Sequence, residues 1–323
     1  MAVPRRPGIA TLNGDDELRD VGLTGAVRRT VLTMLAASLV SSALVAAPVA
    51  AAPVSAVLVN AADGSVLYAD SADLMRAPAS LTKMMTLFLT FDALDAGRLR
   101  LSDRVVMSRH AAGQAPSKLG LAPGQSLSVD EAIRVIAVQS ANDVSVALAE
   151  KLAGNEPAFA RAMTARARSL GMRRTSFVNA SGLRNRGNVT TAQDIAILSV
   201  AMLRDHPRQY GYFSTRSFQW GNRRVANHNH LLGAVAGVDG IKTGYTADAG
   251  FNLAASAKRG GTRLIAVVMG ERSIRARDQR VARLLEVGFA SVARGRGQSS
   301  AAVATLIRDE VQRRTPRGRS GGG

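Results

Sequence analysis

Two residues near position 80 have the types and the spacing needed to activate a hydroxyl group. Ser80 and Lys83 are three positions apart, and residues so spaced on a helix lie one above the other, within hydrogen-bonding reach. A serine hydroxyl is a poor nucleophile until a base takes its proton. Lys83 can be that base only as a neutral amine, and burial or a nearby cation lowers a lysine pKa toward that state. The pair is therefore a candidate nucleophile and general base.

Two more distant motifs would complete such a site. Ser140 and Asn142 lie at a break between two predicted helices, where a hydroxyl can relay a proton and an amide can hold a substrate carbonyl. Lys242, Thr243 and Gly244 lie on a predicted strand. Lys242 adds a second cation, and Thr243 can donate a hydrogen bond to a carboxylate. Gly244 leaves room for a substrate backbone at the strand edge.

The elements that carry these residues follow from local patterns. Residues 55–70 alternate between apolar and polar side chains around a tight turn, which predicts a β-hairpin. A helix is expected to begin near Ser80 and to stop at Gly97. Residues 128–152 predict two helices, and the pattern is interrupted at residues 139–142. The second motif therefore lies in a connection between helices.

The second half of the chain returns to strands. Two more helices are predicted at residues 159–170 and 191–203, and a closing amphipathic helix at residues 278–290. Short strands are predicted at residues 217–226, 239–246, 251–258 and 262–269. Strands at both ends with helices between them predict an α/β (α+β) fold. Its central antiparallel sheet is assembled from N- and C-terminal segments, flanked by helices, with an inserted, mostly helical subdomain.

The chain divides into three parts. Residues 1–52 form a leader and signal peptide, because two arginines precede an apolar run that ends in small residues. We expect cleavage and export to the periplasm or cell-wall space. The arginine pair is also compatible with a twin-arginine signal. Residues 53–292 form the folded domain, and residues 293–323 a basic tail.

The tail allows two interpretations. Its content of Arg, Gly and Ser predicts disorder. The alternative is one amphipathic helix over residues 300–314, which would make a weak contact with an anionic membrane surface.

Composition excludes several other kinds of site. The chain has 323 residues, of which 46% are hydrophobic, enough for a large core. It has no cysteine, which excludes disulfides, thiolate metal sites and a cysteine nucleophile. The net charge is +18, but the cations are scattered and accompany no nucleic-acid motif. We therefore predict no nucleic-acid partner.

His228 and His230 are the one candidate pair of metal ligands. They flank Asn229 and would point to the same side of a strand, but no third ligand is visible. A hydrogen-bonding role at a strand end is the simpler interpretation, so no metal and no cofactor is expected. His110 and His206 show no partner in the sequence.

The three motifs together resemble a known set. Each is weak alone, but SxxK, SxN and KTG in this order are typical of penicillin-binding proteins and β-lactamases. Residues 78–86 resemble the active-site helix of low-molecular-mass D-alanyl-D-alanine carboxypeptidases. Residues 140–143 resemble the second motif of that family, with Ala141 where glycine is usual, and residues 239–246 the third. Residues 175–183 are similar to a further family stretch, with Ala180-Ser181 in place of the usual Pro-His.

The resemblance implies a serine peptidase mechanism. Ser80 would attack the carbonyl between two D-alanines of a peptidoglycan stem peptide, and Lys83 would be the base. The backbone N–H groups of Ser80 and Tyr245 would bind the oxyanion. Lys242 and Thr243 would face the terminal carboxylate. The family also uses an arginine after the last strand, and Arg277 lies at the matching place. The alternative is that Arg277 is an ordinary surface arginine. β-Lactams would acylate Ser80 and remain bound.

Three alternatives remain open at the level of sequence. A D,D-endopeptidase that cuts cross-links would share all three motifs. A class A β-lactamase needs a glutamate for deacylation, and no Glu-x-x-Leu-Asn stretch occurs between Ser140 and Lys242. A non-enzymatic wall- or membrane-binding protein would not react with penicillin. Larger family members carry a second, β-rich domain and an amphipathic anchor, where this sequence has only the basic tail of residues 293–323.

Overall fold

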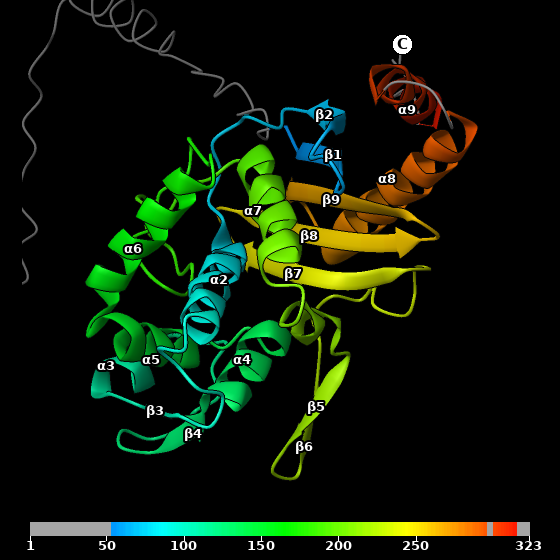
Figure 1. Ribbon diagram of the computed structural model, residues 1–323. Helices are drawn as coiled ribbons and strands as arrows, with labels where there is room; N and C mark the ends of the chain where they lie inside the picture. Colours follow the sequence, from blue (N-terminus) through cyan, green and yellow to red (C-terminus); the bar gives the residue numbers. More distant parts are fainter. Residues whose placement is uncertain (1–52, 296–299, 315–323) are drawn as a thin grey trace, which may run out of the picture. The chain divides into compact units, whose positions relative to one another are not determined.

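A five-stranded antiparallel sheet is built from both ends of the described chain (Figure 1). The computed structural model describes residues 53–295 and 300–314, so the leader and signal peptide predicted for residues 1–52 lie outside the described residues. In spatial order the strands are β2 (Val66–Asp70), β1 (Ser55–Asn60), β9 (Thr262–Glu271), β8 (Gly250–Arg259) and β7 (Val238–Thr246). The predicted fold class is confirmed.

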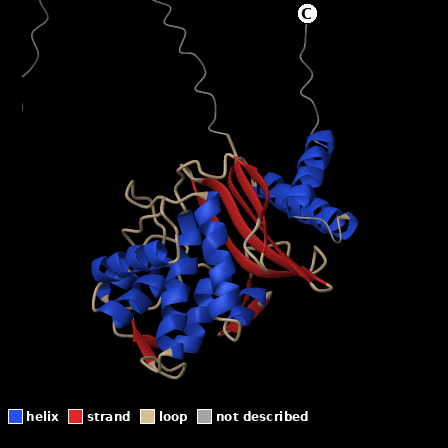
Figure 2. Ribbon diagram, turned by 45° about the horizontal axis from the view of Figure 1, so that its top comes forward, coloured by secondary structure: helices blue, strands red, loops and turns tan. Residues whose placement is uncertain are grey.

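Helices cover both faces of this sheet, as Figure 2 shows. Successive side chains of a strand point to opposite faces, and along β9 both sets are apolar. Ile265 and Val267 pack against the helical block, whereas Leu264 and Ala266 pack against α8 (Ile274–Arg294). All four are 0% exposed. A strand buried on both faces reads as a continuous apolar run, as the sequence of β9 does.

The helical block lies between β2 and β7 along the chain. Four of its helices begin at polar caps, among them Ser128, whose side chain forms a reciprocal capping box with Glu131. Such a box satisfies N–H groups that the first turn leaves free. The block comprises α2 (Thr82–Asp95), α3 (Arg109–Ala112), α4 (Val129–Val138), α5 (Asn142–Ala153), α6 (Glu156–Ser169) and α7 (Ala192–Asp205). Helix α2 is buried on nearly every side, so it is the central element of the block.

Several short elements were not predicted. They are helix α3, two 3₁₀ turns, η1 (Ala79–Leu81) and η2 (Tyr210–Ser214), and a two-stranded antiparallel sheet of β3 (Arg104–Val106) and β4 (Ser126–Ser128). Strands of three residues are too short for periodicity to reveal. The strand expected at residues 217–226 is a hairpin, formed by β5 (Ser217–Trp220) and β6 (Arg223–Ala226).

The placement of His228 and His230 on a strand was wrong. They lie in turns after β6, on either side of Asn229. The Asn229 side chain is 2% exposed and donates a hydrogen bond of 2.9 Å to the carbonyl oxygen of Gly240 on β7. This anchor, rather than strand pairing, holds the two histidines beside the sheet.

The prediction of a disordered tail was wrong for residues 300–314. Helix α8 ends at Arg294, and helix α9 spans Ser300–Arg314. These bounds are those of the amphipathic helix that was the alternative interpretation of the tail. Ile307 is 0% exposed and lies in the apolar cluster between the sheet and α8, with Val311 packed against it. The apolar side of α9 therefore packs on its own domain. Arg283 contributes a contact of 3.5 Å to the carbonyl oxygen of Val311.

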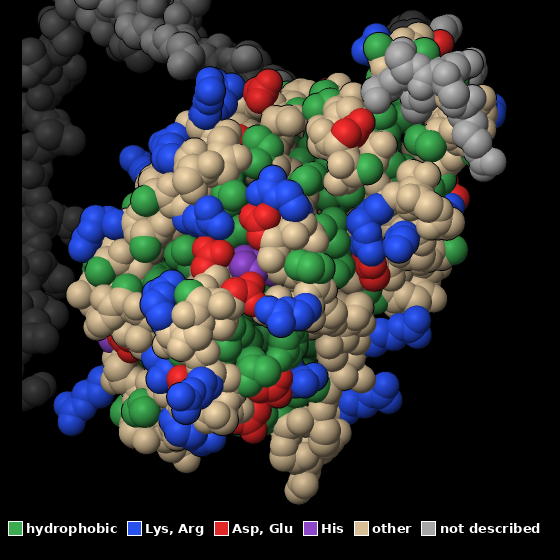
Figure 3. All heavy atoms as spheres, in the orientation of Figure 1, with side chains coloured by type: hydrophobic (Ala, Val, Ile, Leu, Met, Phe, Trp, Pro, Cys, Tyr) green, Lys and Arg blue, Asp and Glu red, His purple; other side chains and the backbone are tan. Residues whose placement is uncertain are grey.

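The surface carries its positive charge in a dispersed form. Figure 3 shows Lys and Arg side chains spread over the whole visible face, with acidic groups between them. No helix within residues 53–295 and 300–314 is long and apolar enough to cross a membrane.

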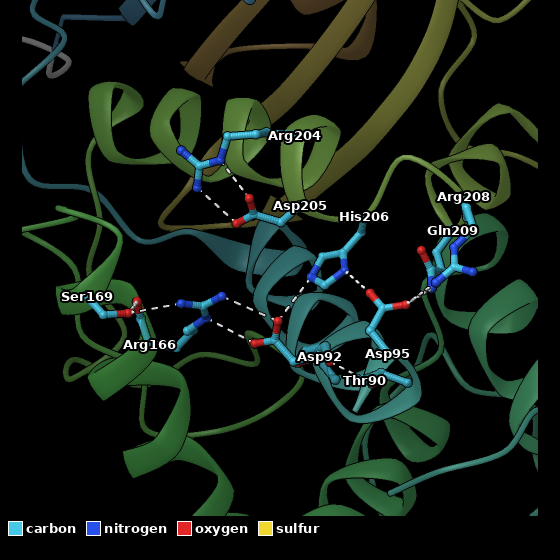
Figure 4. A network of polar contacts seen from close by, with 11 residues as sticks. Thr90, Asp92, Asp95, Arg166, Ser169, Arg204, Asp205, His206, Arg208 and Gln209 are labelled. Atoms are coloured by element: carbon cyan, nitrogen blue, oxygen red, sulfur yellow. Dashed lines mark hydrogen bonds and ion pairs between the residues drawn. The ribbon is translucent and has the colours of Figure 1, made fainter. Parts of the chain in front are cut away.

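The end of α2 that lies away from Ser80 is held by a buried histidine (Figure 4). His206, at the end of α7, has a side chain that is 3% exposed. Its Nδ1 lies 2.8 Å from Asp95 Oδ2, and its Nε2 lies 3.2 Å from Asp92 Oδ1. Arg166 on α6 donates to Asp92 at 3.0 Å. These contacts join α2, α6 and α7.

Candidate active site

The candidate nucleophile lies on the short turn that leads into α2. Ser80 is the middle residue of η1, and α2 itself begins two residues later, at Thr82. The preceding Ala79 has φ of 48°, a conformation that a residue with a Cβ rarely adopts. Such strain persists only where the surrounding structure fixes it. Ser80 thus projects from a constrained backbone at the mouth of a buried helix.

Lys83 is buried beneath Ser80. The side chain is 0% exposed. Its Nζ lies 3.1 Å from Ser80 Oγ, 2.7 Å from Asn142 Oδ1 and 2.5 Å from the carbonyl oxygen of Ser181. Burial, and after it the positive charge of Lys242, hold the pKa of Lys83 well below its usual range, against a smaller opposing effect of Asp143. The geometry and the electrostatics both suit a neutral amine.

The second motif occupies the connection between α4 and α5. Ser140 has φ of 64° and is 6% exposed, and its Oγ is buried without a hydrogen-bond partner among the described residues. Asn142 begins α5 and donates from Nδ2 to the carbonyl oxygen of Ala115 at 2.8 Å. That bond fixes the amide so that Oδ1 faces Lys83. The prediction that this motif interrupts two helices is confirmed.

The third motif lies on β7, the edge strand of the sheet. Gly244 passes so close to the turn of Ser80 that a Cβ there would lie 3.0 Å from the Pro78 carbonyl oxygen and 3.1 Å from the Ser80 nitrogen. Lys242 is 2% exposed and donates to the carbonyl oxygen of Thr243 at 3.2 Å. Burial and the charge of Arg277 lower its pKa to about 7.

The three motifs converge on one pocket of about 450 Å³. Ser80, Ser140, Asn142, Thr243 and Gly244 all line it. Lys83 and Lys242 lie beneath the residues that line the pocket, since both lysines are almost completely buried. The structure therefore brings together groups that are up to 164 positions apart in the chain, from Ser80 to Gly244.

The two remaining candidates form the outer part of the pocket. Tyr245 is 56% exposed, and its ring stacks on Phe251 with 4.3 Å between centroids. Arg277 is 3% exposed, lies in the first turn of α8 and lines the pocket. Its guanidinium donates to Asp278 at 2.7 and 2.9 Å. Arg277 is therefore not an ordinary surface arginine.

The sequence did not single out the loop that closes the pocket over Lys83. The carbonyl oxygen of Ser181 accepts from Lys83, and that of Ala180 accepts from Thr86 at 2.7 Å. Gly182 has φ of 77°, and a Cβ there would overlap the carbonyl oxygen of Ala79. The only signal for this loop was the similarity of residues 175–183 to a family stretch.

His228 and His230 also line the pocket. Burial lowers the pKa of His228 to about 4, and the charges of Lys242, His230 and Arg277 act in the same direction. His230 Nδ1 lies 3.2 Å from Asp278 Oδ2. Within the described part of the chain, no three His, Asp or Glu side chains form a group that could hold a metal ion.

Comparison with known proteins decides the family. The model of peptidase family S11, D-alanyl-D-alanine carboxypeptidase, matches residues 41–273. The chain belongs to this family. Among S11 relatives, D-alanyl-D-alanine carboxypeptidase DacF of Bacillus subtilis is 39% identical over 240 residues, which cover 72% of this chain and 61% of DacF. DacA of Escherichia coli K12 is 38% identical over 239 residues, which cover 72% of this chain and 59% of DacA.

Solved structures of this family share the fold. Penicillin-binding protein 5 of Haemophilus influenzae aligns with a TM-score of 0.70 and 36% identity, over 73% of this chain and 70% of that one. Penicillin-binding protein D2 of Listeria monocytogenes, in its cefotaxime-bound form, aligns with a TM-score of 0.67 and 32% identity, over 73% and 96%. The match spans only about three fifths of the length of DacF and DacA, at 61% and 59%.

Proposed function

We propose that this chain is a serine D-alanyl-D-alanine carboxypeptidase, which removes the terminal D-alanine from peptidoglycan stem peptides through an acyl-enzyme. One observation carries the proposal: the buried Lys83 amine lies 3.1 Å from Ser80 Oγ and has a lowered pKa. A nucleophile and base in such contact are the requirement for covalent catalysis by a hydroxyl.

Counting hydrogen bonds supports Lys83 as the base. A neutral amine has two N–H donors and one lone pair. Asn142 Oδ1 and the Ser181 carbonyl oxygen can only accept, so they take both donors. The lone pair is left for the third neighbour, and the Ser80 hydroxyl can donate to it. In this state the proton of Ser80 already points at its acceptor.

The edge of β7 suits a peptide substrate. An edge strand has backbone groups that can pair with an extended peptide, and β7 ends the sheet on the side of the pocket. The Ser80 nitrogen lies next to Gly244, which supports the proposal that the N–H groups of Ser80 and Tyr245 bind the oxyanion. Loss of one such donor typically costs about 3 kcal/mol of transition-state stabilisation.

Cations gather where the substrate carboxylate would bind. The charge of Arg277 lowers the pKa of Lys242, and both Thr243 and Arg277 line the pocket that Ser80 lines. A carboxylate bound beside these residues would accept a hydrogen bond from Thr243 and would raise the pKa of Lys242. A free C-terminal D-alanine satisfies this requirement.

The reaction then proceeds in two halves. Ser80 Oγ attacks the carbonyl carbon of the bond between the D-alanines while its proton passes to Lys83. The C–N bond breaks, and the leaving amine takes a proton from Lys83, directly or through the unpartnered hydroxyl of Ser140. Water enters, loses a proton to Lys83 and attacks the ester carbonyl; the bond between that carbon and Ser80 Oγ breaks, and Lys83 returns the proton to Ser80. A β-lactam would acylate Ser80 in the same way and remain bound; penicillin-binding protein D2 of Listeria monocytogenes has been solved in a cefotaxime-bound form.

The proposed substrate lies outside the cytoplasm, which agrees with the signal pattern in residues 1–52. We propose export to the periplasm or cell-wall space, with a role in wall biogenesis and cell shape. The basic surface would favour an anionic wall. Any membrane contact would rest on the charges of the tail, because Ile307 is buried.

The test is the release of D-alanine from a pentapeptide that ends in D-alanyl-D-alanine. Wild-type protein should release it and should be labelled by fluorescent penicillin, with the adduct found on Ser80 by mass spectrometry. Ser80→Ala should do neither while remaining folded. Ser199→Ala, which changes a buried serine of α7 that bonds its own helix, is the matched control and should retain both activities.

Two results would redirect the proposal. Release of D-alanine by Ser80→Ala would contradict the mechanism. Cleavage of purified cross-linked wall fragments in preference to the pentapeptide would instead indicate a D,D-endopeptidase, and rapid turnover of nitrocefin a β-lactamase.

A further inference from the structure

A buried asparagine lies directly beside Gly244 on the neighbouring strand. Asn252 is 0% exposed and is the residue of β8 that pairs with Gly244 of β7. Paired residues of adjacent strands point to the same face of a sheet. The side chain of Asn252 therefore faces the same turn that Gly244 approaches. No motif in the sequence marked this residue.

Three backbone groups fix the orientation of the Asn252 amide. The N–H of Gly270 on β9 can only donate, and it lies 2.9 Å from Oδ1. The Nδ2 group is therefore left to donate, and it lies 3.3 Å from the carbonyl oxygens of both Ala77 and Pro78. One side chain thus ties two strands of the sheet to the segment immediately before the nucleophile.

That segment needs an external constraint. Ala79 is held at φ of 48°, a conformation that a residue with a Cβ rarely adopts and that persists only if neighbours enforce it. The Pro78 carbonyl oxygen also accepts from the Leu81 N–H at 3.2 Å. Fixing this oxygen therefore fixes the start of η1. The position of the Ser80 N–H follows from the same turn.

We propose that Asn252 is a positioning residue for the oxyanion hole. It holds the turn of Ser80 at a fixed separation from β7, and so sets the distance between the N–H groups of Ser80 and Tyr245. It touches neither substrate nor the reacting atoms. Its removal leaves Ser80 and Lys83 in contact but lets the two N–H donors drift apart. The inference rests on the proposed function.

Two substitutions separate this role from packing. Asn252→Asp keeps the size and the acceptor for Gly270 but turns a carboxylate oxygen toward two carbonyl oxygens. Asn252→Ala removes the donor without adding charge. Ser256→Ala is the control, because Ser256 is also 0% exposed, lies four residues along on the same face of β8, and bonds Arg263 instead of the turn.

The measurement is kcat and KM for D-alanine release, together with the affinity for a peptidyl boronic acid, whose tetrahedral adduct on serine mimics the transition state. Both Asn252 variants should lose about 100-fold in kcat, the range seen for one oxyanion donor, with little change in KM. Boronate affinity should fall by the same factor as kcat/KM. Ser256→Ala should leave kcat and boronate affinity unchanged, whatever its effect on the melting temperature.

Other results would overturn the positioning role. One is an Asn252 variant with unchanged kcat; another is a loss of kcat without loss of boronate affinity, or an equal loss in Ser256→Ala. If only one Asn252 variant folds, that variant decides. Failure of the proposed function looks different, because the wild-type protein itself would then release no D-alanine and bind no penicillin.

Discussion

Both ends of helix α2 bury a nitrogen base, and the surroundings of the two bases are opposite in charge. At the first end Lys83 contacts a hydroxyl and two uncharged oxygens, with the cation Lys242 nearby. At the far end His206 lies between the carboxylates of Asp92 and Asp95 (Figure 4). The same helix therefore offers a direct comparison of burial with and without a counter-ion.

Burial acts in the same direction on the two bases, but the outcome differs. It lowers the pKa of Lys83, and Lys242 lowers it further. Burial also lowers the pKa of His206, but hydrogen bonds and charges of Asp92 and Asp95 outweigh it, so the net pKa is raised. The choice of partners thus favours the neutral form of Lys83, which can accept a proton, and the charged form of His206, which holds helices together.

The largest effect is expected from removing the uncharged base. Lys83→Met preserves the length of the side chain but not its lone pair. Since general bases contribute up to about 10⁴-fold, we expect kcat for D-alanine release to fall at least about 10³-fold, with the melting temperature maintained or raised. The control is Lys151→Met on the exposed side of α5. Near-normal kcat in Lys83→Met would show that another group takes the proton of Ser80.

The next test gives Lys83 the kind of partner that His206 has. Asn142→Asp places a carboxylate where Oδ1 now lies, 2.7 Å from Nζ. The carboxylate should raise the pKa of Lys83, and each unit above the assay pH costs about tenfold in rate. The acid limb of kcat/KM should therefore move to higher pH, with partial recovery in alkaline buffer. Asn142→Ala, which adds no charge, should lose activity without that shift; an unmoved limb in Asn142→Asp would contradict the electrostatic argument.

The smallest effect on catalysis is expected at the far end. His206→Gln removes the cation, while Asp92 keeps Arg166 and Asp95 keeps Arg208. The free energy of unfolding should therefore fall by about 2 kcal/mol, as for lost hydrogen bonds to charged groups, while kcat of the folded fraction stays within about twofold. Urea unfolding and kcat measured on the same samples would show this. A large loss of kcat with intact stability would mean that the two ends are coupled.

The pH dependence of that stability has a definite sign. Because the folded pKa of His206 is raised above 6.5, its contribution is fully present below 6.5 and is lost as pH rises through the raised value. The pKa values of Asp92 and Asp95 are lowered below 3.8, so their contribution is lost as pH falls through those values. The stability difference between wild type and His206→Gln should shrink at alkaline pH.

The sequence predicted the first end of α2 much better than the second. Ser80 and Lys83 form a short-range pair whose geometry follows from helical periodicity, and the three-motif order predicted that distant segments would join them. Neither Asn252 nor His206 could be found in this way, because their partners lie 174 and 111 positions away. The main prediction for α9 was wrong because its composition resembles that of a linker. Its few apolar residues nevertheless pack against the rest of the domain.

The central claim is that Lys83 is an uncharged amine in the resting protein, and lysine NMR tests it directly. The chain has five lysines, so a sample labelled with ¹³C at the lysine ε-carbon should give five resolvable signals, assigned with Lys83→Arg and Lys242→Arg. We predict that Lys242 titrates at about 7 and that Lys83 titrates well below the usual lysine value of about 10.4. A Lys83 signal that titrates near that usual value would contradict the account.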